Sequence, residues 1–302
     1  MTAQASRSAE TGREKSFENN WGEQVRPSNR ERLMPRSVID WLNQRAFSSG
    51  AAKKFYDRAS TLLEAESVLL DELAPEIKNR KLLDIGIGGG RTTPFLLKIS
   101  PDYTGIDYSP VLVERAKSRL HLESLYVCDV RDMSRFADCA FDFALFSFNG
   151  LDHISHQDRL QALREIHRVL RPDGIFAFSS HNREWKNAGK PPWRFHDKSW
   201  TLPFLKSCFW ALVFQPRHWR LRRFEVFEND YAIMNDGGLY YSVFSYYSSI
   251  RSQMAQLQEL AFHGTRAYDI HGRVVNEDRD SPWLYYVARK ASGPNARGGT
   301  SG

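Results

Sequence analysis

Hydrophobic and polar residues follow two different periods along the middle of the chain. Short apolar runs bounded by turn residues predict strands at 81–85, 103–107, 124–128, 141–146 and 174–179. Apolar residues at helical spacing predict helices between them, at 92–100, 109–120 and 157–170. Because strands alternate with helices, residues 81–182 are predicted to form the core of an α/β fold, with a mostly parallel sheet and helices on both faces.

Helical spacing also occurs before this core. It predicts helices at 36–47 and 52–74, which together form an N-terminal helical segment, 36–74. A polar stretch of mixed charge, residues 1–29, precedes them and is expected to be a disordered or loosely attached arm. At the other end, residues 291–302 are small and polar and are expected to be a flexible tail.

The alternation of strands and helices stops after the fifth strand. Residues 183–247 are rich in tryptophan, phenylalanine and arginine, and we expect them to be an insertion that serves as a lid or an acceptor-binding subdomain. Within this insertion, Asn-Asp-Gly-Gly at 235–238 predicts a hairpin between 231–233 and 239–244.

The core pattern returns after the insertion. A helix is predicted at 248–261 and two further strands at 265–269 and 283–288. Residues 248–290 therefore close the sheet, and we expect 30–290 to be a single domain.

Composition narrows the class of protein. The chain has 302 residues, of which 41% are hydrophobic and 26% charged, which suits one or two globular domains with a substantial core. Its three cysteines show no metal-binding or disulfide spacing, so no metal is expected. The polar start of the chain and the absence of long apolar runs predict a cytoplasmic protein. A net charge of +6 permits a nucleic-acid or membrane-surface partner without requiring one, and the oligomeric state stays open.

A glycine-rich turn follows the first predicted strand. Asp84 precedes Gly86, Gly88 and Gly90, and a helix follows them. Glycine lets the backbone turn tightly and approach a ligand, while the start of the helix offers unpaired N–H groups. A dinucleotide fingerprint would need glycine where Arg91 stands, so this turn matches it poorly.

Acidic residues after the next two strands indicate the ligand. Asp107, followed by Tyr108, ends the second strand, where a carboxylate can accept both ribose hydroxyl protons. Asp129, followed by Val130, comes after the third strand, where it can accept from an adenine amino group while Val130 packs on the ring. Asp84 would face a positive amine. Adenine, ribose and an ammonium-bearing tail together describe S-adenosylmethionine.

Residues 81–182 resemble the class I S-adenosylmethionine-dependent methyltransferases. The resemblance rests on five motifs in family order: LLDIGIGGGR, GIDYS, CDVRD, FDFALFSFNGLDHI and LREIHRVLRPDGIFAFSSHN. It implies a Rossmann-like sheet of seven strands whose last strand is inserted antiparallel. It also implies cofactor contacts at Gly86, Asp107, Asp129 and the 147–149 loop, which includes Phe148 and Asn149. Tyr56, in an N-terminal helix, is a further candidate for covering the cofactor.

Candidate catalytic residues follow the fourth and fifth strands. Asp152, His153 and His181 lie where ligands bind in such sheets, and either histidine could be a general base or a structural residue. The main hypothesis is methyl transfer to oxygen or nitrogen of a small molecule, for example a sugar or a secondary metabolite. A non-catalytic scaffold and, more remotely, a dehydrogenase are the competing classes.

The insertion leaves other acceptors open. The Asn/Asp-Pro-Pro-aromatic tetrad of the enzymes that methylate nucleobase amines is absent after the fourth strand, which disfavours a nucleic-acid base as acceptor. Residues 202–223, however, join an apolar run to a basic one. This pattern fits a peripheral membrane contact or a lipid-linked acceptor, an RNA or protein substrate, or simply a packed lid helix with a solvated edge.

Overall fold

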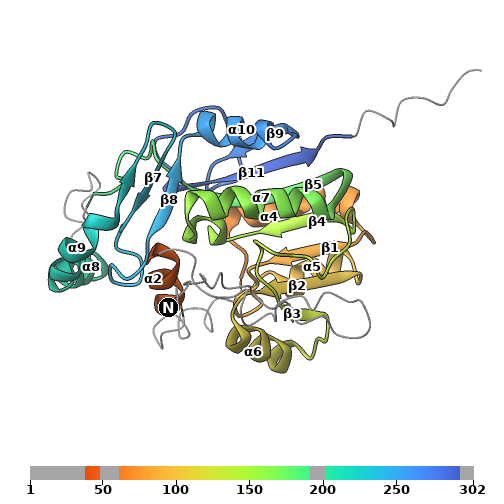
Figure 1. Ribbon diagram of the computed structural model, residues 1–302, viewed down its shortest axis with the longest axis horizontal. Coiled ribbons are helices and arrows are strands. Elements are labelled where there is room, and N and C mark those ends of the chain that lie inside the picture. Colours follow the sequence, from red (N-terminus) through yellow and green to blue (C-terminus); the bar gives the residue numbers. More distant parts are fainter. Residues whose placement is uncertain (1–37, 48–60, 191–200, 293–302) are drawn as a thin grey trace, which may run out of the picture.

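A computed structural model describes residues 38–47, 61–190 and 201–292, and the strands it contains join one sheet (Figure 1). The predicted arm 1–29, Tyr56, the first part of the predicted helix 52–74 and nearly all of the predicted tail lie outside these ranges.

The sheet is built from strands that match most of the sequence predictions. The strands are β1 (Leu82–Ile85), β2 (Tyr103–Asp107), β3 (Leu125–Val127), β4 (Phe141–Phe146), β5 (Leu170–Asn182), β6 (Val226–Phe227), β7 (Tyr231–Met234), β8 (Ser245–Ser248), β9 (Phe262–Tyr268), β10 (Val274–Val275) and β11 (Trp283–Lys290). The helices are α2 (Val38–Phe47), α4 (Glu64–Ile77), α5 (Thr93–Ile99), α6 (Pro110–Leu120), α7 (His156–Val169), α8 (Leu202–Val213), α9 (Gln215–Leu221) and α10 (Ile250–Glu259), with short 3₁₀ turns η1 (Gly150–His153) and η3 (Arg222–Phe224).

The order of the strands is that of a Rossmann-like methyltransferase sheet. Along the main path it runs β10-β9-β11-β5-β4-β1-β2-β3. Strands β1 to β5 pair in parallel, and β11 is inserted antiparallel between β5 and β9. The predicted fold class is therefore confirmed, and β6, β7, β8 and β10 extend the seven core strands.

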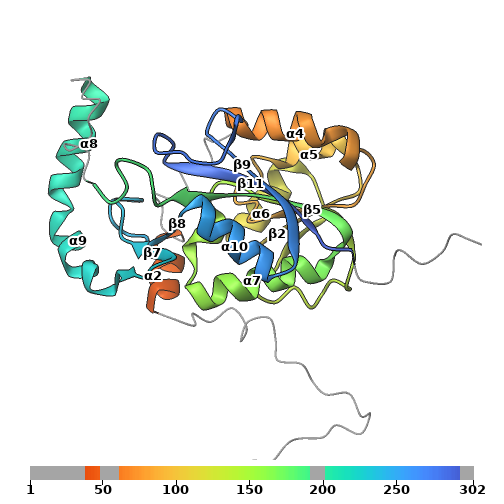
Figure 2. The same cartoon turned by 90° about the horizontal axis from the view of Figure 1, so that it is seen from above.

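Two apolar layers enclose the sheet because alternate strand residues point to opposite faces. Leu83 packs with α7 and α10 on one face, whereas its neighbour Leu82 packs with α4, α5 and α6 on the other. In the view from above, α4 and α5 lie on one side of the sheet and α7 and α10 on the other (Figure 2). Ser109 caps the start of α6, followed by Pro110 in the first turn, and the Ser109 hydroxyl accepts from the backbone N–H of Leu112.

The insertion adds strands to the sheet as well as helices at its edge. Strand β8 pairs in parallel with the end of β5, and β7 and β6 follow it outward. The predicted hairpin exists, but its second strand is β8, at Ser245–Ser248, rather than 239–244. Leu239, Tyr240 and Tyr241 have positive φ angles, so they turn the chain and cannot extend a strand. Within the described ranges, no helix is long and apolar enough to cross a membrane.

Candidate functional site

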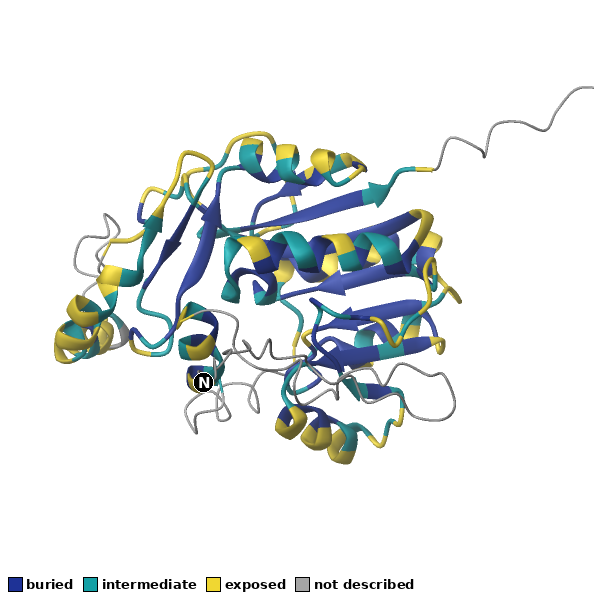
Figure 3. Cartoon of the chain, viewed as in Figure 1, coloured by how far each residue is buried: buried dark blue, intermediate teal, exposed yellow. Residues whose placement is uncertain are grey.

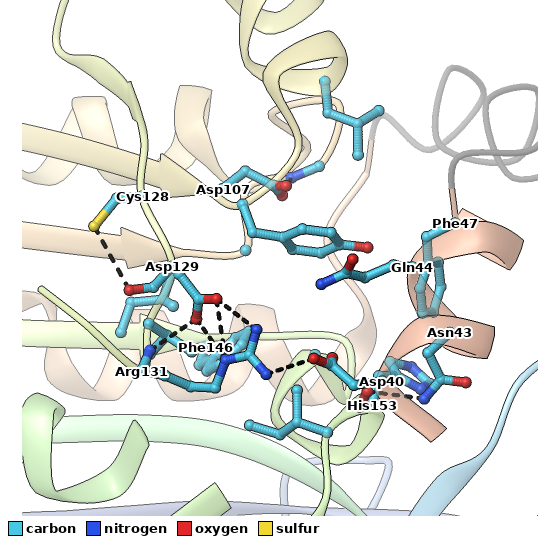
Figure 4. Close-up of a pocket in the computed structure, with 18 residues that line it drawn as sticks. Asp40, Asn43, Gln44, Phe47, Asp107, Cys128, Asp129, Arg131, Phe146 and His153 are labelled. Atoms are coloured by element: carbon cyan, nitrogen blue, oxygen red, sulfur yellow. Dashed lines mark hydrogen bonds and ion pairs between the residues drawn. The ribbon is translucent and has the colours of Figure 1, made fainter. Parts of the chain in front are cut away.

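A pocket opens at the carboxyl ends of the first four strands. It encloses about 810 Å³, a volume that includes space open to solvent. Six of the predicted cofactor residues line it: Gly86, Gly88, Asp107, Tyr108, Asp129 and Val130. Helix α2 closes the opposite side, as the close-up shows (Figure 4).

The glycine turn has the backbone that its sequence predicts. Gly86, Gly88 and Gly90 all have positive φ angles, which other residues rarely adopt. A Cβ atom at Gly86 would lie 2.7 Å from the ring of Phe146, so a side chain here would collide with the pocket wall. The turn therefore requires glycine at position 86, both for its backbone conformation and for its close packing against Phe146.

Asp107 links the glycine turn to the start of α6. One carboxylate oxygen accepts from the backbone N–H of Gly88 at 2.9 Å, and the other accepts from that of Ser109 at 2.8 Å. Burial raises the pKa of Asp107 to about 6, although these two hydrogen bonds act in the opposite direction. A buried carboxylate at the pocket wall is suited to bind ligand hydroxyl groups.

Asp129 belongs to a buried ionic network. Both of its oxygens accept from Arg131, whose Nη2 lies 2.6 Å from Oδ2. The same guanidinium reaches Asp40 of α2 at 2.7 Å and Asp158 of α7 at 3.3 Å. Arg131 thus lies between Asp129 and Asp40 and ties helix α2 to the floor of the pocket (Figure 4).

Helix α2 is held over the pocket by one buried amide. Asn43 donates through Nδ2 to the carbonyl oxygens of His153 and Phe244, at 2.8 and 2.9 Å, and its Oδ1 accepts from the backbone N–H of Phe244. Phe47, at the end of the same helix, meets the His153 ring edge-on at 4.7 Å. Both side chains line the pocket, so α2 forms its roof.

Asp84 lies outside the lining of this pocket. Its Oδ2 accepts from the hydroxyls of Thr92, at 2.7 Å, and Tyr103, at 2.9 Å. Burial raises its pKa to about 6. These hydrogen bonds secure the glycine turn from behind, and the contact of Asp84 with a ligand amine stays a prediction. Gly90 is also outside the lining.

The 147–149 loop is fixed by a second ionic cluster. Arg91, in the glycine turn, pairs with Glu66 of α4, and Ser147 donates a hydrogen bond to the same carboxylate. The Arg91 guanidinium also lies over the Phe148 ring, 5.2 Å from its centre. Phe148 and Asn149 adopt positive φ angles and do not line the pocket.

Asp152 and His181 form a buried hydrogen-bonded pair. Asp152 accepts from His181 Nδ1 at 2.7 Å and from the backbone N–H of His181, and it also pairs with Arg159 at 2.6 Å. Asn149 Nδ2 faces His181 Nε2 at 3.4 Å. Burial lowers the pKa of His181, but the hydrogen bond and charge of Asp152 outweigh it, so the net shift is upward.

His153 lies between this pair and the pocket. It lines the pocket, and its ring centre is 6.3 Å from that of His181. Burial and the neighbouring His181 lower its pKa, so it is a neutral ring at physiological pH. The structure thus brings Asp152, His153 and His181 together, with His153 alone among the three lining the pocket.

Cys128 is not a nucleophile despite lining the pocket. Burial raises the pKa of its thiol to about 12, so the reactive thiolate is not populated.

Sequence reasoning missed the residues that close the site. Asp40, Asn43, Gln44 and Phe47 of α2 and Arg131 all line the pocket. A signal existed for α2: an aspartate and an asparagine three positions apart lie among the apolar residues of the helix. Two polar residues on one helical face indicate buried hydrogen bonds when that face packs.

Comparisons with known proteins agree with this geometry. Residues 83–178, about a third of the chain, match the family model described as a methyltransferase domain. The malonyl-[acyl-carrier protein] O-methyltransferase of Pseudescherichia vulneris is 28% identical over 141 residues, covering 46% of this chain and 55% of the relative. A ubiquinone biosynthesis O-methyltransferase of Coxiella burnetii is 29% identical over 114 residues, covering 36% and 47%. The chain thus spans about half the length of these curated relatives.

Solved structures show the same fold. The 1,6-didemethyltoxoflavin-N1-methyltransferase of Burkholderia thailandensis, solved with its substrate and S-adenosylhomocysteine, superposes with a TM-score of 0.52 at 14% identity, covering 89% of this chain and 93% of that one. With the strand order and the glycine turn, these matches show that residues 83–178 form a methyltransferase domain, as the resemblance to class I S-adenosylmethionine-dependent methyltransferases predicts.

Proposed function

We propose that this protein transfers a methyl group to an oxygen or nitrogen atom of a small-molecule acceptor, with His181 as the general base. The observation that carries the proposal is the hydrogen-bonded pair of Asp152 and His181. The His181 ring lies next to that of His153, which lines the edge of the cofactor pocket. Two relatives are named O-methyltransferases, which supports an oxygen acceptor.

The residues of the pocket fit the cofactor. Gly86 and Gly88 give the turn its positive φ angles at the pocket wall, Asp107 offers a buried carboxylate for ribose hydroxyls, and Val130 with Asp129 would hold the adenine. Both oxygens of Asp129 already accept from Arg131, so contact with the adenine amino group would use a remaining lone pair. The bound cofactor would supply an activated methyl group.

The residues around His181 prepare it to take a proton. With Nδ1–H donating to Asp152, the lone pair on Nε2 is left to accept. The buried Oδ1 of Asn149 has no hydrogen-bond partner among the described residues. Flipping the side-chain amide of Asn149 would exchange the positions of Oδ1 and Nδ2. The oxygen would then face a protonated Nε2 of His181 and accept its hydrogen bond. Asn149 could thus accommodate both protonation states.

A small acceptor suits the enclosure of this site. Helix α2 closes the pocket on one side, and Phe244 and His153 are held against it through Asn43. A roofed pocket excludes water and orients the acceptor, which methyl transfer needs more than it needs a strong base.

Calorimetric titration tests cofactor binding first. We expect S-adenosylmethionine and S-adenosylhomocysteine to bind and NADH to show no heat. Asp107→Ala should weaken binding by about 1–3 kcal/mol, because ligand hydroxyls would lose a buried acceptor. Asp102→Ala, at an exposed site before the same strand, is the matched control. Equal affinity of the two variants would refute the ribose assignment.

Transfer of a labelled methyl group into small-molecule fractions of a cell extract tests the reaction. His181→Asn should retain cofactor binding and lose most of the transfer, by about 10²–10⁴-fold if proton removal is required. If His153→Asn were the more damaging change and His181→Asn nearly silent, the base would be His153. Label found only in protein or RNA would overturn the choice of a small acceptor.

A further inference from the structure

Helices α8 and α9 carry an apolar face that the described part of the chain leaves uncovered. Phe209 is 58% exposed, Leu212 60% and Trp219 77%. The exposed large apolar residues of α8 recur at helical spacing and so share one face: Leu202, Leu205, Phe209, Leu212 and Val213. These two helices form the rim of the molecule furthest from the sheet, and they are mostly exposed (Figures 2 and 3). Monomeric soluble proteins rarely expose so continuous an apolar surface to solvent.

The charge on these helices has a single sign. Residues 202–224 contain Lys206, Arg217, Arg220, Arg222 and Arg223 and no acidic residue. Within the described ranges, no carboxylate lies within ion-pair distance of Lys206, Arg220 or Arg223, while Arg222 has a long contact of 3.6 Å with Glu225. An apolar face bordered by unneutralised cations complements a surface that is apolar inside and anionic outside.

We propose that α8 and α9 bind the surface of an anionic lipid bilayer. The apolar face of α8 would enter the boundary between headgroups and acyl chains, with Trp219 at the interface and the arginines against lipid phosphates. A second copy of this chain is a poorer occupant, because a symmetric contact would bring two basic patches together. This proposal does not depend on methyl transfer.

The surface is firmly attached to the body of the protein. His218 Nδ1 lies 3.0 Å from Asn235 Oδ1, and Arg217 donates to the Ser242 hydroxyl at 2.6 Å and to the Tyr240 carbonyl at 3.2 Å. Residues 235–244, which receive these contacts, also include Phe244, the partner of Asn43 in the pocket roof. A bilayer bound at α8 and α9 would therefore hold the whole domain at the membrane.

Co-sedimentation with vesicles tests the proposal on the full chain. We expect binding to vesicles with about one quarter phosphatidylglycerol in phosphatidylcholine, weak binding to phosphatidylcholine alone, and a loss of affinity between about 50 and 500 mM salt. The triple variant in which glutamine replaces Arg220, Arg222 and Arg223 should bind anionic vesicles about tenfold more weakly, or weaker still. The double variant Phe209→Asp with Leu212→Asp should abolish it.

Matched variants separate this surface from general effects of charge and folding. The control for charge replaces three exposed arginines of the main domain together by glutamine: Arg80, Arg164 and Arg251. This triple variant loses the same charge at a different place and should bind vesicles as the wild type does. Val274→Asp, at an exposed site on β10, is the control for the apolar substitutions. Far-ultraviolet circular dichroism and S-adenosylhomocysteine affinity verify that each variant is folded.

Four outcomes would overturn the proposal. They are an absence of vesicle binding by the folded protein, equal binding to neutral and anionic vesicles, equal effects of the two arginine triples, and salt-sensitive binding of RNA in place of vesicles. A dimer in sedimentation that Leu212→Asp dissolves, without vesicle binding, would assign the face to a second copy.

Discussion

The buried carboxylates in and near this site differ in the groups that offset the cost of burying their negative charge. Asp152 pairs with Arg159, and Asp129 pairs with Arg131. Asp107 is held by backbone N–H groups, whereas Asp84 is held by the neutral hydroxyls of Thr92 and Tyr103. Burial consequently raises the pKa of Asp84 to about 6. Its charge is retained at neutral pH at a cost in stability.

Asp84→Asn should therefore stabilise the protein at pH 7.5. Both hydroxyls donate to a single oxygen of Asp84, so an amide oxygen can accept both of them. The folded pKa lies above the unfolded value, so the wild-type stability falls as pH rises from about 4 to about 6. We expect a gain of about 1–3 kcal/mol in the free energy of unfolding at pH 7.5 that vanishes below pH about 4.

Denaturant unfolding of both proteins at several pH values measures this gain. Asp142→Asn, at a carboxylate that pairs with Arg171 near the surface, is the control and should show no such gain. A destabilised Asp84→Asn protein at pH 7.5 would show that the charge is needed by the fold.

His181 should govern the pH dependence of turnover. A general base acts in its neutral form, and Asp152 raises the pKa of His181 despite its burial. The rising limb of kcat should therefore lie above the ordinary histidine value of about 6.5. His181→Asn should remove this limb and leave cofactor affinity within about twofold, because His181 does not line the pocket. A limb that persists in this variant would move the titration to another group.

At the scale of elements, α2 is the part of the site that sequence patterns predict least well. Its large apolar residues Val38 and Trp41 are 52% and 47% exposed, whereas the buried positions are Asp40, Asn43 and Ala46. Hydrophobic periodicity assumes that burial follows apolar surface. Here specific polar bonds to Arg131, His153 and Phe244 orient the helix instead.

Asn43→Ala tests whether α2 closes the pocket. The change removes three hydrogen bonds to buried backbone groups of residues 153 and 244, each of which would lose its partner. We expect a loss of about 2–4 kcal/mol in stability and weaker S-adenosylhomocysteine binding, measured by denaturant unfolding and calorimetry. Arg45→Ala, at an exposed position on the same helix, is the control. Unchanged affinity in a destabilised Asn43→Ala protein would show that α2 does not contribute to cofactor binding.

The elements of the core could be predicted because each signal was local. The strand-to-helix turns at Gly86 and Ser109 depend on backbone conformation and capping, which a few neighbouring residues decide. The pairing of β8 with β5 and the contacts of Arg131 with Asp40 join residues more than 60 positions apart. No local pattern encodes such a partner, so these parts of the site required the structure.

At the scale of the whole molecule, the insertion is hydrogen-bonded to α2, the helix that closes the pocket. Residues 235–244 are fastened to α9 on one side and, through Phe244, to Asn43 and His153 on the other. The membrane surface that we propose and the roof of the cofactor pocket therefore share one loop. Binding at either place should restrict the same segment.

Hydrogen exchange with bound S-adenosylhomocysteine can follow this coupling. A ligand between the glycine turn and α2 must slow exchange in both 84–90 and 38–47, although the two are far apart in sequence. At a ligand concentration of about 100 times Kd, a local unfolding event that releases the ligand costs about 2.7 kcal/mol more than in the free protein. Hydrogen exchange through such events therefore slows by about a hundredfold. Residues 235–244 should be protected as well, because Asn43 holds Phe244. Residues 262–275, at the far edge of the sheet, should exchange as before, and protection confined to 84–90 would mean that α2 opens independently of the cofactor.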